Sequence, residues 1–430
     1  MRTVCKWLGP VLVLAVISVI LVSIASGVAC GDTGTVPFTL ADDLPAGQAG
    51  ASTLDRSGET VEIFTVKADE EAGARPQPPS ITSPSAIVID AATGRVLYEQ
   101  RAHVRRPMAS TTKIMTAVLA LENLPMDRQV TVSESAGWTY EPKPILRPGD
   151  VITIEQLLYA LLVQSSNGAA VALAETLDGG VEAFAARMNA KAEQLGMADT
   201  HFVTPNGLDA AGHYSTAADM ATVARYAMEN ARFSAIVDTS AYSLVLPGRS
   251  KPLELVNTNK LLTRDEWVTG IKTGDTPRAK RCLVGSATRD GVSVISVLLG
   301  QLSSETCWKE SEGLLEYGLA QCRHVTLLQQ GAVLAESQKP YRIDDPVRLV
   351  AQDTVEATVC RDDEVTVSVR IDRNPVLPVK DGESFGQVVL TVGGDEIGSV
   401  DIVADRSYTQ TTLGTKVVYL CGRIVDWLGG

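Results

Sequence analysis

The sequence predicts an α+β fold, in which an antiparallel sheet with a helical body is followed by a small all-β domain. Apolar runs typical of strands occur early, at residues 86–90, and again late, at 268–299, with helical periodicity between them. After Cys322 the pattern changes to strict alternation, which is clearest in Val365–Ile371. Alternation of this kind is typical of strands with one buried face. Two differently built domains are therefore expected in succession.

The elements of the first domain follow from their local patterns. The run 86–90 turns at Thr93–Gly94 and returns at 95–99, which predicts a β-hairpin at a sheet edge. Apolar residues at helical spacing, or in long buried runs, predict the helices, and shorter β-branched runs predict the strands. These helices and strands are expected at 110–121, 152–162, 169–177, 268–274, 282–287 and 292–299.

The N-terminal part predicts export and a linker. Residues 1–29 have a basic start and a long uncharged apolar run, which is typical of a signal peptide or a membrane anchor. Cleavage, lipidation at Cys30 and retention all stay open, and each puts the rest of the chain outside the cytoplasm. Residues 30–84 are rich in Gly, Pro, Ser and acidic residues, so we expect a flexible acidic linker. Only Val61–Val66 has the composition of a short strand.

The C-terminal segment, 411–430, is expected to be an amphipathic helix. Leu413, Val417 and Ile424 are among the apolar residues that would share one helical face. Such a helix fits a membrane interface, and docking onto the protein itself explains the pattern equally well.

Composition excludes several function classes. A net charge of −13 argues against nucleic acid and anionic lipid as charge-driven partners. The seven cysteines and four histidines form no C-x-x-C motif and no cluster with metal-ligand spacing, so no metal and no cofactor is expected. Cys307 and Cys322 are a candidate disulfide in an exported protein, with separate buried thiols as the alternative.

The stretch Pro107–Thr116 carries the first chemical motif. Ser110 lies in the first turn of a predicted helix, and Lys113 follows on the same face. The helix dipole favours a developing anion at Ser110, and apolar neighbours disfavour the charged form of Lys113. A desolvated lysine can take the proton of a serine nucleophile. A helix-capping serine followed by a solvated lysine would produce the same short pattern.

Two further motifs favour the catalytic interpretation of Ser110 and Lys113 over the capping one. Ser165 and Asn167 lie on the predicted connection between two helices, where polar side chains can face a cleft. Lys272, Thr273 and Gly274 end a predicted strand. S-x-x-K, S-x-N and K-T-G in this order are typical of acyl-serine enzymes that act on peptide or lactam carbonyls.

On these motifs the chain resembles the serine D-alanyl-D-alanine carboxypeptidases of peptidase family S11, which are low-molecular-weight penicillin-binding proteins. The resemblance extends from Ser85 onward. It implies a penicillin-binding, β-lactamase-like transpeptidase fold at 85–322, a C-terminal β domain at 323–410 and the helix at 411–430. Further segments similar to the family are Asp90–Gly94, Pro205–Asp209, His213–Ala217, Leu314–Gly318, Pro378–Gly382 and Phe385–Gly386.

The resemblance also implies roles for the motif residues. Ser110 would be the nucleophile and Lys113 its general base. Ser165 would pass the proton to the leaving amine, and Asn167 would hold Lys113 and the substrate amide.

The third motif would bind the substrate's end. Lys272, Thr273 and Gly274 would receive the terminal carboxylate, and the backbone N–H groups of Asp275 and Ser110 would hold the oxyanion. Asp275 stands where many members of the family have His.

The resemblance implies that the substrate is a peptidoglycan stem peptide ending in D-Ala-D-Ala, with β-lactams as inhibitors. It implies a place in the bacterial cell envelope, with the membrane reached through the N-terminal segment, the C-terminal helix or both. A β-lactamase is disfavoured, because no Glu between Asn167 and Lys272 has Asn four residues later. A D,D-endopeptidase that cuts crosslinks and a catalytically impaired wall protein remain the alternatives.

Overall fold

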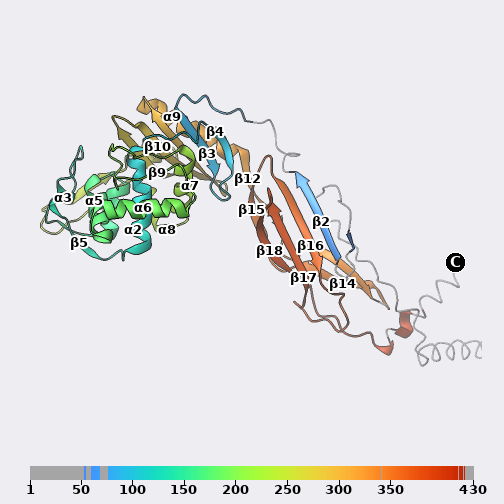
Figure 1. The fold of residues 1–430 in the computed structure, drawn as a ribbon. Coiled ribbons are helices and arrows are strands. Elements are labelled where there is room, and N and C mark those ends of the chain that lie inside the picture. The colour runs from blue at the N-terminus through green and yellow to red at the C-terminus, as the bar shows by residue number, and fades with distance from the viewer. Residues whose placement is uncertain are drawn as a thin grey trace, which may run out of the picture. The chain divides into compact units, whose positions relative to one another are not determined.

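The computed structural model describes residues 53–54, 60–67, 76–339, 341–414, 416–419 and 421 (Figure 1). The predicted signal or anchor at 1–29, much of the segment 30–84 and the end of the C-terminal helix lie outside these residues. The chain divides into two compact units. One is Ala72–His324, and the other joins the residues from Val325 onward to the described strands before Ala72.

A five-stranded antiparallel sheet is the centre of the Ala72–His324 unit, with the strand order β4-β3-β11-β10-β9. Its strands are β3 (Ser85–Asp90), β4 (Val96–Gln100), β9 (Val268–Thr276), β10 (Lys280–Arg289) and β11 (Val292–Gln301). The predicted hairpin is β3–β4, and the three late apolar runs are β9, β10 and β11. Strands from both ends of the unit therefore meet in one sheet, which confirms the predicted α+β class.

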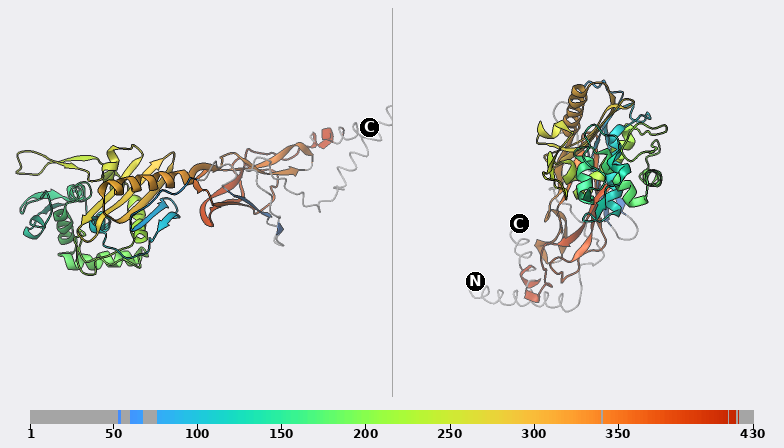
Figure 2. Two further views of the ribbon diagram at one scale, coloured as in Figure 1. Left: turned by 90° about the horizontal axis from the view of Figure 1, so that it is seen from above. Right: turned by 90° about the vertical axis from the view of Figure 1, so that its left-hand side faces the viewer.

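Helices cover both faces of this sheet (Figures 1 and 2). On one face, α9 (Ser304–Gln321) packs against β3, β10 and β11. On the other face lies the helical body, of which α7 contacts β3 and β11. The helices of this body are α2 (Lys113–Asn123), α3 (Glu134–Gly137), α4 (Ile154–Leu162), α5 (Asn167–Asp178), α6 (Val181–Gln194), α7 (Ala217–Met228) and α8 (Ala231–Val237). The unit also contains two short 3-10 helices, η2 (Ala109–Thr112) and η3 (Lys260–Thr263). Two strand pairs complete it, namely β5 (Gln129–Thr131) with β6 (Val151–Thr153) and β7 (Ala241–Leu244) with β8 (Leu253–Val256).

Side-chain caps determine where the helices of the body begin. Thr153 forms a capping box with Gln156 at the start of α4. Ser166 accepts a hydrogen bond from the Ala169 N–H at the start of α5, and Gly179, in the left-handed region at φ 76°, ends that helix. The connection between α4 and α5 is thus short and fixed at both ends. Ser165 and Asn167 sit on this connection.

The second unit contains a seven-stranded sheet in the order β1-β2-β16-β17-β18-β14-β13. The predicted alternation at Val365–Ile371 is present in β16, whose every second residue is buried. The strands are β1 (Thr53–Leu54), β2 (Thr60–Lys67), β13 (Val333–Lys339), β14 (Arg342–Ala351), β16 (Glu364–Ile371), β17 (Ser384–Val392) and β18 (Asp395–Ala404), with β12 (Cys322–Leu328) and β15 (Val355–Cys360) as a separate pair. The all-β prediction for this part is confirmed.

Within the segment expected to be a linker, β2 is a full strand that pairs with β16 along its whole length. The expectation of a linker throughout 30–84 is therefore wrong for residues 60–67. An eight-residue strand rich in β-branched residues gains a complete ladder of backbone hydrogen bonds against β16. Its partner lies so far along the chain that no local pattern reveals the pairing.

The candidate disulfide between Cys307 and Cys322 is wrong. Cys307 is a free, buried thiol, whereas Cys322 and Cys360 are each disulfide-bonded. Cys307 lies near the start of α9 and Cys322 directly follows its end. Along a continuous helix the axial distance between these two cysteines is about 22 Å, far beyond the reach of a disulfide.

The described part of the C-terminal segment is helical at 413–414, 416–419 and 421. Its Tyr419 ring packs edge-on against Tyr341 of the β unit, with centroids 5.4 Å apart. The Lys416 ammonium lies 5.5 Å from the same ring. The start of this segment therefore docks onto its own unit. Among the described residues, no helix is both long and apolar enough to cross a membrane.

A buried carboxylate ties α9 to the beginning of the Ala72–His324 unit. Glu310 accepts hydrogen bonds from the backbone N–H and hydroxyl of Thr82, both at 2.6 Å, and from the backbone and hydroxyl of Ser83. Gln301 adds a further donor at 3.1 Å. Burial alone would raise the pKa of Glu310, but these hydrogen bonds bring the pKa below its ordinary value of 4.5.

We therefore expect Glu310→Ala to lower the free energy of unfolding by about 3 kcal/mol, because five donors lose their acceptor, among them the buried groups of Ser83 and Gln301. Urea denaturation of the full chain measures this change. Because folding lowers the pKa of Glu310, the stabilisation is present above pH 4.5 and is lost as the pH falls below that value. Glu305→Ala removes an exposed carboxylate of the same helix and should change stability by less than about 0.5 kcal/mol. Equal losses in the two variants would contradict this assignment.

Candidate active site

Ser110 lies in η2, a single 3-10 turn directly before α2. The prediction placed it in the first turn of the helix itself; the α-helix begins at Lys113. The turn is held by its own threonines, since the Thr111 and Thr112 hydroxyls each donate 2.7 Å hydrogen bonds to the carbonyls of Met108 and Ala109. The Ser110 side chain is left half-buried at the end of a buried turn.

Lys113 is completely buried and points back at Ser110. Its Nζ lies 2.7 Å from Ser110 Oγ, 2.7 Å from Asn167 Oδ1 and 2.8 Å from the carbonyl oxygen of Asn206. Burial, and after it the charge of Lys272, holds the pKa of Lys113 well below its ordinary value, while Glu141 acts in the opposite direction.

This geometry suits a neutral amine. A neutral Lys113 has two N–H donors and one lone pair. Asn167 Oδ1 and the Asn206 carbonyl can only accept, so they take the two N–H groups. The lone pair then faces the Ser110 hydroxyl and can receive its proton.

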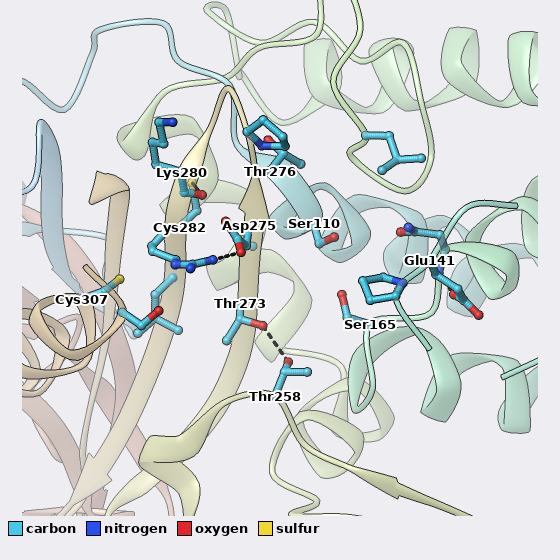
Figure 3. Close-up of a pocket in the computed structure, with 18 of the residues that line it drawn as sticks. Ser110, Glu141, Ser165, Thr258, Thr273, Asp275, Thr276, Lys280, Cys282 and Cys307 are labelled. Carbon is cyan, nitrogen blue, oxygen red and sulfur yellow. Dashed lines mark hydrogen bonds and ion pairs between the residues drawn. The ribbon is translucent and has the colours of Figure 1, made fainter. Parts of the chain in front are cut away.

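The second predicted motif forms the opposite wall of the site. Asn167 is buried, accepts from Lys113 and donates from Nδ2 to the Tyr140 carbonyl at 2.7 Å. Ser165 has φ 65°, a left-handed conformation that is uncommon outside glycine and costs about 1–3 kcal/mol. Figure 3 shows the Ser165 hydroxyl in the same cleft as that of Ser110.

Sequence reasoning noted Pro205–Asp209 as a segment similar to the family but gave Asn206 no role in the site. Its contribution to Lys113 is a main-chain carbonyl, which has no residue-type signal. Gly207, at φ 81°, lets this loop reach the η2 turn that carries Ser110, because a Cβ there would lie 1.9 Å from the Ala109 carbonyl oxygen. Asp209 holds the same loop to the β9–β10 turn by accepting from the Thr276 hydroxyl at 2.7 Å.

The third motif lies on β9, which packs against η2. Thr273 and Gly274 line the cleft, and the Thr273 and Thr258 hydroxyls lie 2.6 Å apart. A Cβ on Gly274 would come within 3.1 Å of the Ser110 backbone nitrogen, so glycine lets the strand approach the N–H of Ser110. Lys272 is 1% exposed, and burial lowers its pKa to about 7.

Asp275 follows on the same strand and lines the cleft. Its carboxylate forms an ion pair with Arg281, which lies opposite it in the β9–β10 register. Figure 3 shows Asp275 on the strand wall of the cleft, with the ion pair drawn as a dashed line. The negative charge that the sequence places near a carboxylate-binding motif is therefore compensated within the sheet.

The three motifs enclose one cleft of about 910 Å³. Cys282 and Cys307 also line it, but burial raises the pKa of both thiols to about 12. These thiols therefore stay protonated and are poor nucleophiles at neutral pH. The structure thus brings together Ser110, Lys113, Ser165, Asn167, Thr273, Gly274 and Asp275 around the cleft and puts Lys272 close behind its wall.

Known proteins of similar sequence cover both units. The family profile described as D-alanyl-D-alanine carboxypeptidase, peptidase family S11, matches residues 72–303. The profile of the C-terminal domain of penicillin-binding protein 5 matches residues 323–410. D-alanyl-D-alanine carboxypeptidase DacA of Escherichia coli K12 is 32% identical over 82% of this chain and 91% of its own length. DacF of Bacillus subtilis is 29% identical over 80% of this chain and 89% of its own length.

Solved structures agree with the sequence comparisons. The D-alanyl-D-alanine carboxypeptidase DacD of Francisella tularensis is 28% identical, with a TM-score of 0.57 over 80% of this chain and 98% of that chain. The Streptomyces K15 DD-transpeptidase is 34% identical, with a TM-score of 0.55 over 57% of this chain and all of that one. The match to the S11 profile spans more than half of the chain and contains all three motifs. The chain belongs to the D-alanyl-D-alanine carboxypeptidase family, the S11 serine peptidases.

Proposed function

We propose that the chain is a serine-type D-alanyl-D-alanine carboxypeptidase, with Ser110 as the nucleophile and Lys113 as its general base. The observation that carries this assignment is the 2.7 Å contact between Ser110 Oγ and a fully buried Lys113 Nζ whose other neighbours are acceptors. Membership of the S11 family supports the reaction class. The complete hydrogen-bond network also argues against a catalytically impaired site.

Acylation follows from this arrangement. Ser110 Oγ attacks the carbonyl carbon between the two D-alanines, and its proton passes to Lys113 Nζ. The carbonyl oxygen becomes an oxyanion, which the N–H groups of Ser110 and Asp275 stabilise. The close approach of β9 to the Ser110 nitrogen supports this pair of donors.

Release of D-alanine and hydrolysis complete the cycle. When the tetrahedral intermediate collapses, the C–N bond breaks and the leaving amine takes the proton from Lys113 through the Ser165 hydroxyl. The product is free D-alanine, and the rest of the peptide stays as an ester on Ser110. Water then attacks the ester, gives one proton to Lys113 and yields the shortened peptide, while Ser110 Oγ recovers its proton from Lys113. A β-lactam carbonyl would acylate Ser110 by the same first step.

The proposed setting is the outer face of the cytoplasmic membrane, with peptidoglycan stem peptides that end in D-Ala-D-Ala as the substrate. The apolar N-terminal run supports export, with the alternatives of cleavage, lipidation and retention unchanged. The docking of Tyr419 onto Tyr341 supports a C-terminal helix that begins on the β unit. Attachment to the membrane is proposed through either terminal segment.

We expect Ser110→Ala to abolish both covalent labelling by a fluorescent penicillin and release of D-alanine from a peptide ending in D-Ala-D-Ala. Lys113→Ala should lower both rates by about 10²–10⁴-fold, because the general base is lost. Ser234→Ala removes a serine of α8 whose hydroxyl bonds only its own helix, and should match the wild type. Labelling that persists in Ser110→Ala would contradict the assignment of the nucleophile. Labelling without D-alanine release in the wild type would contradict carboxypeptidase activity.

A pH dependence follows from Lys272. Because the pKa of this amine is about 7, its positive charge disappears as the pH rises through 7. We expect kcat/KM for a peptide with a free terminal carboxylate to fall above that pH, by about tenfold per unit where the charged form is required. A stopped assay of D-alanine release between pH 5 and 10 measures the profile.

The matched control is the same peptide with a C-terminal amide, which has no carboxylate for Lys272 to attract. Its kcat/KM should be lower at neutral pH and should lack the decline that Lys272 causes. Identical alkaline profiles for the acid and the amide would show that Lys272 does not bind the carboxylate through its charge.

A further inference from the structure

The loop between α3 and β6 inserts a carboxylate at the start of α5, where it is part of the wall of the cleft. Glu141 Oε2 accepts hydrogen bonds from the backbone N–H of Asn167 at 2.6 Å, from the Ser166 hydroxyl at 3.0 Å and from the Gly168 N–H at 3.4 Å. Its other oxygen, Oε1, accepts from the Ile145 N–H at 2.9 Å. Both oxygens act only as acceptors, which a carboxylate can satisfy and an amide cannot.

These contacts satisfy the first N–H groups of α5, which have no partner within the helix. A negative charge at this end is also favoured by the helix dipole. Tyr140, the residue before Glu141, also holds Asn167, because its carbonyl accepts a hydrogen bond from Asn167 Nδ2 at 2.7 Å. Asn167 is thus held by its backbone and by its side-chain amide, which leaves Oδ1 directed at Lys113.

We propose that Glu141 is a positioning residue for acylation: its carboxylate holds the first turn of α5 so that Asn167 Oδ1 meets Lys113 Nζ. This inference rests on the proposed function. Without the Asn167 contact, one N–H of Lys113 loses its acceptor and the lone pair is no longer directed at Ser110. Figure 3 shows Glu141 on the same side of the cleft as Ser165, across from Thr273 and Asp275.

Glu141 also acts on Lys113 through its charge. Two charged groups affect this amine: Lys272 of β9 lowers its pKa and Glu141 raises it, while burial has the largest effect. Removing the charge of Glu141 should therefore move the protonation of Lys113 to lower pH. A purely structural support would leave that titration unchanged.

The experiment compares wild type, Glu141→Ala and Glu141→Gln in the full chain, by the second-order rate of acylation with a fluorescent penicillin between pH 4 and 9. Glu141→Ala should acylate about 10- to 100-fold more slowly at pH 7, because the reacting groups are no longer aligned. Glu141→Gln keeps one acceptor oxygen and the side-chain volume, so its loss should be smaller. In Glu141→Gln the acid limb of the profile should move to lower pH.

Glu175→Gln is the matched control. This carboxylate lies on α5 itself and accepts a hydrogen bond from the Ser133 hydroxyl at 2.6 Å, without contacting Asn167. It should keep the wild-type rate at pH 7 and the wild-type pH profile. Thermal unfolding of every variant shows whether the protein is folded, and Glu141→Gln serves as the readout if Glu141→Ala does not fold.

The outcomes distinguish a failure of the proposed function from a failure of the inference about Glu141. Wild-type rates and profiles in both Glu141 variants would overturn the inference. A slower rate shared by Glu141→Gln and Glu175→Gln, with no movement of the acid limb, would also overturn it, because general support of α5 would then explain the loss. If the wild type itself is not labelled, the proposed function fails and this inference fails with it. If the wild type is labelled, both Glu141 variants change as described and Glu175→Gln does not, both stand.

Discussion

A buried lysine amine that hydrogen-bonds to uncharged groups is the constraint on which the catalytic unit depends. Transferring an ammonium group from water to the protein interior costs several kcal/mol, so the fold favours the neutral amine of Lys113. The site contains what a neutral amine needs, namely two acceptors for its N–H groups and one hydroxyl for its lone pair. Each neighbour comes from a different segment, which explains why α5, the Asn206 loop and η2 must meet at one point.

The rest of the unit brings these segments into contact. β9 is the edge strand of the sheet, and it passes η2 so closely that a Cβ on Gly274 would make unusually tight contacts of 3.0–3.1 Å. The Asn206 loop reaches the same turn only because Gly207 also lacks a Cβ. Glycine at these two contacts and the left-handed Ser165 are unfavourable choices for local stability. They are found around Ser110, at the cleft where the proposed reaction would take place.

A part of this site could be predicted from the sequence where the residues that form it lie close together along the chain. Ser110 and Lys113 are three residues apart on one turn, so their pairing follows from helical geometry alone. The Asn206 carbonyl could belong to any residue type, and the contact between Glu141 and α5 joins positions 26 residues apart through a loop without periodicity. The disulfide expectation failed because proximity along the chain is not proximity in space when a straight helix intervenes. Alternation predicted β16 well, and its partner β2 poorly, because the pairing is not local.

The pairing of β2 with β16 also has a consequence for how the chain is made. Lys67 lies opposite Glu364, so about 300 residues must be synthesised before the earlier strand can find its neighbour. The catalytic unit is in effect an insertion between two strands of one sheet. Such a long loop is slow to close, and the early strand keeps an open hydrogen-bonding edge in the meantime. The contacts of the catalytic unit lie within its own sequence, so this unit can fold while β2 is still unpaired. The β unit is therefore expected to be the last part of the protein to fold.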